Sequence, residues 1–338
     1  MDALVATTLC YGLVPPVIME FPGITAGGGF SGTSGESSSF RHGFFDRTVN
    51  WVEIVLADGE IVIASSTERP DLFWGTAAAF GTFGVITLLE VQLREAKEYV
   101  ALTYTTTSSA DHAMLLVEEA TADTSVEYLD AIVYKKDWIV VCSGRLTNSG
   151  PQEARIQRFT RACDPWFYRH VEKLTASHPS AITELIPLTD YLFRYDRGGF
   201  WVGRYAFKYF VTPFNRITRF FLDRFMHTRV MYHALHQSGH SKRYIIQDVA
   251  VPYNAVPEFI DWLHENFEPY PLWLCPLKQT GNRLDSPRGL LASASVAESS
   301  PDYLMNFGIW GPGPLDRREF VRVNRLLEHK VQELGGKK

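Results

Sequence analysis

The sequence predicts an α+β fold built in two parts that meet near Ala96. In the first part, two apolar runs flank Asp58-Gly59, and this dipeptide between apolar runs is a strong signal for a β-hairpin. In the second part, a strand–helix–strand order occurs twice, which suits helices packed on one antiparallel sheet. With 338 residues, 46% of them hydrophobic, the chain can bury a substantial core in one large or two modest domains.

The first part is predicted to alternate short helices and strands. A helix is expected over Ala3–Leu9, followed by an extended stretch over Val14–Met19. The hairpin occupies Trp51–Ala64, and a helix with proline near its first turn occupies Pro70–Phe80. A strand over Val85–Leu93 closes this part.

The second part is predicted to hold one sheet and its covering helices. Ser109 suits the N-cap of a helix that runs to Ala122, because Asp111 follows in its first turn. The last helix is long and amphipathic and ends at Gly335-Gly336. The expected strands are 99–105, 126–134, 138–146, 244–251, 271–277 and 303–310, and the further helices are 256–267 and 316–334.

Composition excludes several classes of protein. The formal net charge of -5 disfavours nucleic acid as a partner for the whole surface. The N-terminus lacks the basic residues of a secretory signal, and no run of about 18 apolar residues predicts a spanning helix. The cysteines are scattered, so we expect a reduced, cytoplasmic environment without a disulfide framework. These cysteines are Cys10, Cys142, Cys163 and Cys275.

Two further motifs carry little chemistry. His233, His236 and His240 stand at helical spacing, but no acidic third ligand follows them, which disfavours a zinc site. A serine hydrolase is disfavoured because GFSGTSG lacks the spacing of a GxSxG turn. No metal site is therefore predicted.

The stretch Ile24–Gly43, ITAGGGFSGTSGESSSFRHG, is the most informative part of the chain. Glycines allow a ligand close to the main chain, and successive free N–H groups form a concave anion site. Hydroxyls add donors that turn to suit a phosphate or a ribose. The stretch therefore predicts a loop that holds a phosphorylated cofactor, with a flexible Gly/Ser loop as the alternative. It fits neither a P-loop, which needs a lysine, nor a Rossmann turn, which needs a following helix.

Several stretches in order along the chain resemble one family. They are ITAGG, GESSS, EIVLADGE, DLFWG, GTFGVIT, RYIIQDVAVP and YPLWLCP. This set is similar to the Δ24-sterol reductase branch of the vanillyl-alcohol-oxidase/p-cresol-methylhydroxylase (PCMH) superfamily of FAD-binding proteins. The resemblance implies a partial PCMH-type FAD-binding domain over 1–96, with its second subdomain only. It also implies an α+β cap domain over 97–338, with an aromatic and basic helical insertion at 191–243.

The resemblance also implies a chemistry. It points to an FAD-dependent oxidoreductase that reduces an isolated alkene of a sterol or terpenoid-like lipid, with NADPH as the reductant. A departure from the family pattern lies at Ser34 and Gly35, where the family commonly has glycine and then an apolar residue. The implied FAD contacts are Thr25, Gly27, Gly28, Gly32, Ser34, Glu36, Ser37 and Ser38, with Gly84 and Val85 on the ring or adenine side.

Alkene reduction also needs a proton donor, for which the sequence offers Asp248, Tyr270 and Cys275. Asp248 stands in the apolar strand IIQDVAVP, where burial would raise its pKa. The alternative is a structural carboxylate held by hydrogen bonds. Similarly, GTFGVIT could form only a tight turn before a core strand.

Compared with the family, the sequence lacks the first flavin subdomain and an aromatic-rich tail. Because FAD is held between two subdomains there, we expect weak or absent FAD binding by this chain alone. The alternative is a flavin-less remnant, or an incomplete gene model, that binds a lipophilic ligand or folds a polyene for a non-redox cyclisation.

The stretch 191–229 carries thirteen aromatic residues, and its eight Lys or Arg against two acids give a net charge of +6. Interleaved aromatic and basic residues suit peripheral contact with a membrane, such as that of the endoplasmic reticulum. They also suit an apolar tunnel with a basic rim, or a packed helical pair with solvated arginines. Single-stranded nucleic acid fits the composition but has no other support.

Overall fold

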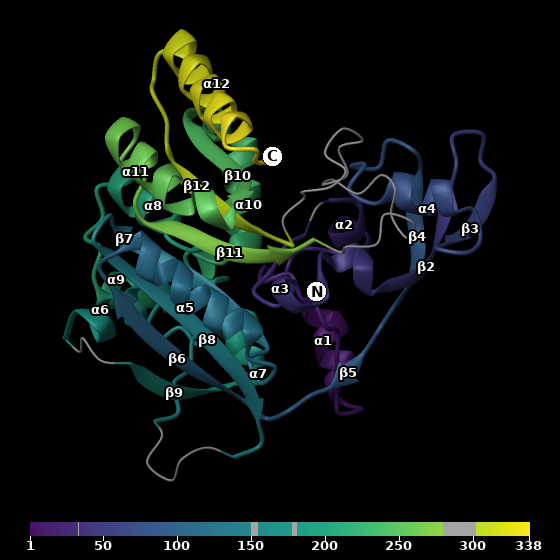
Figure 1. Ribbon diagram of the computed structural model, residues 1–338, viewed down its shortest axis with the longest axis horizontal. Helices are drawn as coiled ribbons and strands as arrows, with labels where there is room; N and C mark the ends of the chain where they lie inside the picture. The colour runs from purple at the N-terminus through teal and green to yellow at the C-terminus, as the bar shows by residue number, and fades with distance from the viewer. Residues whose placement is uncertain (33, 150–154, 178–180, 280–301) are drawn as a thin grey trace. The chain divides into compact units, whose positions relative to one another are not determined.

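The computed structural model describes residues 1–32, 34–149, 155–177, 181–279 and 302–338 (Figure 1). The chain divides into two compact units. The first comprises Met1–Met19, Gly23–Ala96 and Leu277–Leu304, and the second comprises Glu20–Pro22, Lys97–Pro276 and Met305–Lys338. The division therefore falls after residue 96, with two exceptions. Residues 20–22 belong to the second unit, and residues 277–304 belong to the first.

The first unit is built on a three-stranded antiparallel sheet in the order β3-β2-β4. Its hairpin turns at Gly59, whose φ of 89° lies in the left-handed region that glycine adopts without strain. One face of the sheet is core, because Val52, Ile54, Val62 and Ala64 are buried. The strands are β2 (Val49–Val55), β3 (Ile61–Ser65) and β4 (Val85–Val91), and the other elements are α1 (Asp2–Leu9), β1 (Leu13–Val14), α2 (Ala26–Ser31), α3 (Ser39–His42), η1 (Phe45–Thr48), α4 (Pro70–Thr76) and β5 (Arg94–Glu95).

The second unit is built on a seven-stranded sheet in the order β10-β12-β11-β7-β8-β6-β9. The strands are β6 (Tyr99–Thr107), β7 (Tyr128–Lys135), β8 (Trp138–Thr147), β9 (Ile182–Pro187), β10 (Tyr244–Pro252), β11 (Leu272–Lys278) and β12 (Tyr303–Pro312). The helices are α5 (Ala110–Ala122), α6 (Phe167–Ser177), α7 (Leu188–Leu192), α8 (Gly203–Tyr209), α9 (Arg216–Phe221), η2 (Asp223–Phe225), α10 (Thr228–Gln237), η3 (His240–Arg243), η4 (Tyr253–Ala255), α11 (Val256–Asn266) and α12 (Arg317–Glu333).

Aromatic rings cover one face of this second sheet. Asp130 of β7 pairs with Cys142 of β8, which pairs with Tyr104 of β6, so these three side chains share a face. The ring of Tyr104 lies 6.4 Å from that of Phe167 in α6. Farther along the sheet, Phe200 packs 4.4 Å from the ring of Trp310. Figure 1 shows α5 and α11 along the same sheet, in front of its strands.

Most expected elements are present, with three differences. The helix expected over 70–80 ends at Thr76, because Ala78 and Phe80 take positive φ values of 57° and 52°. The extended stretch expected over 14–19 contributes only Val14 to a strand. Further elements, among them α2, α3, β5, α6, β9 and α7, were not predicted, and α2 occupies part of the glycine-rich stretch.

Candidate functional site

Part of the glycine-rich stretch is a short helix, α2, which corrects the prediction of an open loop there. Thr25 caps helix α2, and its Oγ1 accepts a hydrogen bond from the Gly28 N–H at 2.9 Å. The Gly29 N–H donates to the Thr25 carbonyl, and the Gly32 N–H donates to the Gly28 carbonyl. Three of the amides that the sequence offered to a phosphate are therefore used inside the helix.

The first turn of α2 keeps two amides available. Among the described residues, the N–H groups of Ala26 and Gly27 have no hydrogen-bond partner, as expected where a helix begins. Gly27 lies against β4, and a Cβ added to it would meet its nearest atom, in Ile86, at 3.9 Å. Such contact is ordinary, so the packing of the protein itself does not require glycine here. The chemistry of these donors fits an anionic oxygen.

Three other glycines are closely packed: Gly29 and Gly35 of the glycine-rich stretch, and the predicted contact Gly84. A Cβ on Gly29 would overlap the Sδ and Cε atoms of Met19, and one on Gly35 would lie 2.7 Å from Leu277. At Gly84 a Cβ would lie 2.6 Å from the Val55 carbonyl oxygen in the neighbouring strand. Gly84 therefore allows its turn to approach β2 closely. This agrees with the alternative in which GTFGVIT forms only a tight turn before a core strand.

The serine-rich stretch folds inward as it leads into α3. Ser37 and Ser38 are only 4% and 2% exposed, so they lie inside the unit. The Ser39 hydroxyl accepts a hydrogen bond from the Glu36 N–H at 2.9 Å and thereby holds the turn. Ser34 and Glu36 remain half-exposed. Of the predicted contacts in the serine-rich stretch, only these last two stand at the surface.

The second face of the small sheet is apolar and exposed. Val55 pairs with Ile61 on one side and with Val85 on the other, and these two neighbours are 62% and 66% exposed. In the next row, Ile63 and Leu88 flank Glu53 and are 37% and 54% exposed. Because the opposite face is core, this sheet has two apolar faces. The exposed face offers an apolar surface for a flat ring system or for further protein.

Asp248 is the most accessible of the three candidate proton donors. Its carboxylate accepts hydrogen bonds from Trp310 Nε1 at 3.3 Å and from Asn306 Nδ2 at 3.4 Å. Surrounding protein atoms raise its pKa by desolvation, and these two hydrogen bonds only partly offset the rise. The side chain nevertheless remains open to solvent on the edge strand β10. The raised pKa of Asp248 agrees with the prediction made from the apolar strand around it.

Tyr270 and Cys275 occupy different surroundings. Tyr270 lines a cavity of about 760 Å³ together with Tyr134 and His264, and its hydroxyl is buried without a hydrogen-bond partner among the described residues. Burial, and then the charges of nearby carboxylates, raise the pKa of Tyr270 to about 12. Cys275 is completely buried in β11. Asp248 stands on β10 and Cys275 on β11, and β12 lies between these two strands.

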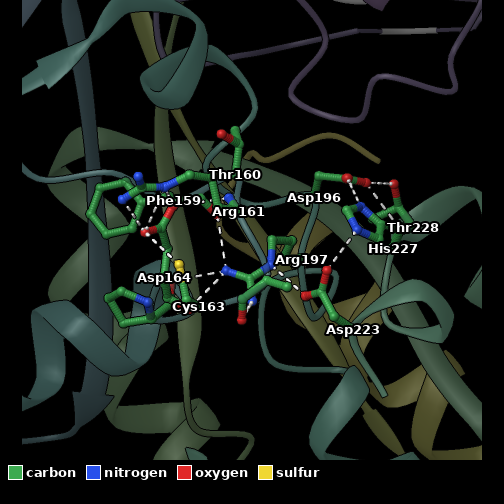
Figure 2. A network of polar contacts seen from close by, with 12 residues as sticks. Phe159, Thr160, Arg161, Cys163, Asp164, Asp196, Arg197, Asp223, His227 and Thr228 are labelled. Carbon is green, nitrogen blue, oxygen red and sulfur yellow. Dashed lines mark hydrogen bonds and ion pairs between the residues drawn. The ribbon is translucent and has the colours of Figure 1, made fainter. Parts of the chain in front are cut away.

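The sequence patterns did not predict two charged networks in the second unit. In one, Arg194 is fully buried between Asp130 and Glu20. In the other, Arg197 binds Asp223 and the main chain of residues 159–165, while His227 joins Asp223 to Asp196 (Figure 2). The available signal was RYDR, Arg194–Arg197, because charges within an aromatic run must find partners when they are buried.

Comparison with known proteins bears on the family. No family model matches the chain. The chain is 27% identical to a Delta(24)-sterol reductase of Homo sapiens over 348 aligned positions, covering 99% of this chain and 64% of that protein. A Delta(24)-sterol reductase of Arabidopsis thaliana is 29% identical over 82% of the chain and 52% of its own length.

The chain is a homologue of the Delta(24)-sterol reductases. A Cytokinin dehydrogenase 9 of Oryza sativa subsp. japonica is 34% identical over 121 residues, which are 34% of this chain. This reductase homologue spans 64% of the length of its human relative. Among the helices that the structure describes, none combines the length and apolarity needed to cross a bilayer.

Proposed function

We propose that this homologue is an FAD-dependent oxidoreductase that reduces an isolated double bond of a sterol or similar lipid, with NADPH as the reductant. The observation that supports the proposal best is its similarity to Delta(24)-sterol reductases over 99% of the chain. The two amides at the start of α2 would supply two donors for a phosphate of FAD. The exposed apolar face of the small sheet supplies a surface for a ring system.

The residues that would hold FAD are a subset of those expected from the sequence. Ala26 and Gly27 would donate main-chain N–H groups, and Thr25 retains its hydroxyl hydrogen for the same use. Ser34 and Glu36 remain at the surface of the unit. Ser37 and Ser38 would act from inside, by fixing the turn rather than by contact with the cofactor.

The bound flavin, once reduced by NADPH, would supply hydride to one carbon of the double bond. The other carbon must receive a proton, and we assign this transfer to Asp248. Its raised pKa keeps more of the carboxyl protonated near neutral pH, while Trp310 and Asn306 fix its orientation. Its position on an edge strand leaves it accessible to a substrate, unlike the buried Cys275.

The test is a turnover assay on the full chain. The protein is incubated with FAD, NADPH and a sterol that carries an isolated side-chain double bond, and the products are analysed by mass spectrometry. The proposal predicts a product with two added hydrogens that requires both cofactors. Unchanged sterol, under conditions in which FAD is bound, would refute it.

A second candidate function is the binding of a lipophilic ligand without redox chemistry. The observation that favours it is the use of the Gly28, Gly29 and Gly32 amides inside α2, which reduces the donors left for a phosphate. It predicts that sterol binds whether or not FAD is present. Calorimetric titration of sterol with and without FAD separates the two functions.

A further inference from the structure

An exposed aromatic face forms part of the second unit. Among the described residues, 22 large apolar side chains are exposed, and nine of them fall within residues 209–232. Helices α9 and α10 both contact η2, so the exposed side chains of these three elements lie near one another, and a large exposed apolar patch marks an interaction site. The aromatic face consists of Tyr209, Phe210, Val211, Ile217, Phe220, Phe221, Phe225, Val230 and Tyr232.

The residues just before this face behave differently, although their composition is similar. Tyr191, Tyr195 and Trp201 are at most 1% exposed and pack on the large sheet. Phe200 stacks on Tyr195 with 3.8 Å between ring centroids. The aromatic stretch is therefore divided: its first half is core, and its second half is surface. The buried first half agrees with the alternative of a packed helical pair. The exposure of the second half needs another explanation.

Helix α9 shows how the face is presented. Asn215 caps the helix by accepting hydrogen bonds from the N–H groups of Ile217 and Thr218. Ile217, Phe220 and Phe221 stand at positions i, i+3 and i+4, so they lie on one side of the helix. All three are exposed, and the helix has no buried residue. An ordered helix thus turns its apolar side to solvent.

A polar network fixes the base of this segment (Figure 2). Arg197 Nε donates to Asp223 Oδ1 at 2.7 Å, and Nη2 donates to the Ala162 carbonyl at 3.0 Å. His227 contacts Asp196 at 2.5 Å and Asp223 at 3.3 Å, so it joins the two sides of the segment. The exposed side chains therefore project from an anchored backbone, which need not become ordered when they bind.

The network also determines the charge of the face. Asp196 and Asp223 are the only acids in residues 191–229, and both are engaged with His227. Lys208, Arg216 and Arg224 are exposed, and none has a carboxylate partner in the part of the chain that the structure describes. The elements that carry the aromatic side chains, α8, α9 and η2, thus also carry positive charge without internal compensation.

We propose that the aromatic face docks this protein on the surface of an anionic phospholipid bilayer. Aromatic side chains enter the headgroup region, and basic side chains bind anionic headgroups. A second copy of the chain is the less suitable occupant, because a symmetric contact through this face would bring its uncompensated positive charges together. This inference is independent of the proposed enzyme activity, since it involves no residue assigned to FAD or to proton transfer.

The test is flotation of the full chain with vesicles of phosphatidylcholine alone or with added phosphatidylserine. We expect binding only to the mixed vesicles, and we expect it to fall as salt rises. The variant R216Q/R224Q should bind about 25-fold more weakly, at about fivefold per charge. The variant F220S/F221S should lose more than about tenfold. Matched controls are Leu315→Ser and Arg318→Gln, which remove an exposed apolar and an exposed basic side chain elsewhere in the second unit.

Thermal unfolding of each variant shows whether its fold is intact. Absence of binding to mixed vesicles would overturn the proposal, as would equal binding to neutral vesicles or full binding by F220S/F221S. Sedimentation velocity tests the other occupant. A dimer that F220S/F221S dissociates, together with no vesicle binding, would show that the face joins two copies of the chain instead.

Discussion

Arg194 and Asp130 form an ion pair without solvent contact, with 2.8 Å between Arg194 Nη2 and Asp130 Oδ2. The same guanidinium lies 2.9 Å from Glu20 Oε1. Tyr195 and Trp273 each donate a hydrogen bond to Asp130 at 3.0 Å. This network ties residue 20, far away in sequence, to the centre of the large sheet.

Removal of the arginine should destabilise the second unit strongly. Arg194→Met leaves two buried carboxylates without a cation, and we expect a loss of about 3–5 kcal/mol in the free energy of unfolding. Asp130→Asn keeps Glu20 as a partner for Arg194, so its loss should be smaller, about 1–3 kcal/mol. Urea denaturation measures both variants, and the reverse order would contradict this account of the network.

The stability of the protein should fall at alkaline pH through His227. Hydrogen bonds to Asp196, and then to Asp223, raise the pKa of His227 to about 9 from its usual 6.5. A raised folded-state pKa gives stability that is fully present below the unfolded pKa of 6.5 and is lost as pH rises through about 9. Because the imidazole is partly exposed, we expect only about 1–2 kcal/mol.

The measurement compares unfolding free energies at pH 6 and pH 10 for the wild type and His227→Gln. The pH dependence of the unfolding free energy of His227→Gln, subtracted from that of the wild type, gives the contribution of His227. His233→Gln, which removes an exposed histidine, is the control. Equal pH dependence in all three proteins would contradict the role of this imidazole.

Two glycines in helices should respond in opposite ways to alanine. Gly29→Ala would force a methyl onto Met19 and should lower the free energy of unfolding by about 1–3 kcal/mol. Gly75→Ala, in α4, meets nothing within 4 Å and should raise it by about 0.5–1 kcal/mol, because alanine favours helix. Thermal denaturation gives both signs. A stabilised Gly29→Ala variant would show that Met19 moves aside easily.

Asp248→Asn should separate catalysis from stability. If Asp248 delivers the proton, the variant should lose about 100-fold to 10,000-fold in turnover. Since a raised pKa marks a carboxylate that the folded state disfavours, the variant should be slightly more stable than wild type at pH 7. Cys275→Ala serves as the comparison in the same assay. Retained turnover in Asp248→Asn would show that Asp248 is a structural carboxylate and not the proton donor.

Local signals predicted much of the fold. The Asp58-Gly59 turn needs only its own backbone geometry, and Ser109 caps α5 by accepting the His112 N–H as the sequence indicated. The long helix α12 follows from its apolar period alone. Each of these elements is determined by neighbouring residues, which is why sequence patterns reach them.

The features that the sequence did not predict depend on contacts between residues that are far apart in the chain. Three glycines disfavour helix, yet α2 forms because its C-terminal end accepts hydrogen bonds from Ala78 and Phe80 and because Gly29 fits against Met19. Strand β9 is short, and its pairing with β6 joins residues such as Thr103 and Thr183. No local pattern reports such partners, and the buried ion pair of Arg194 was missed for the same reason.

The most direct test of the cofactor site is calorimetric titration of FAD into the wild type and two alanine variants. We expect weak FAD binding by the wild type and at least about tenfold weaker binding by Gly27→Ala, since a methyl there obstructs a ligand without disturbing the packing on Ile86. Gly75→Ala should bind FAD like the wild type. Equal affinity of the wild type and Gly27→Ala, or no FAD binding by either, would contradict the assignment of this helix to the cofactor.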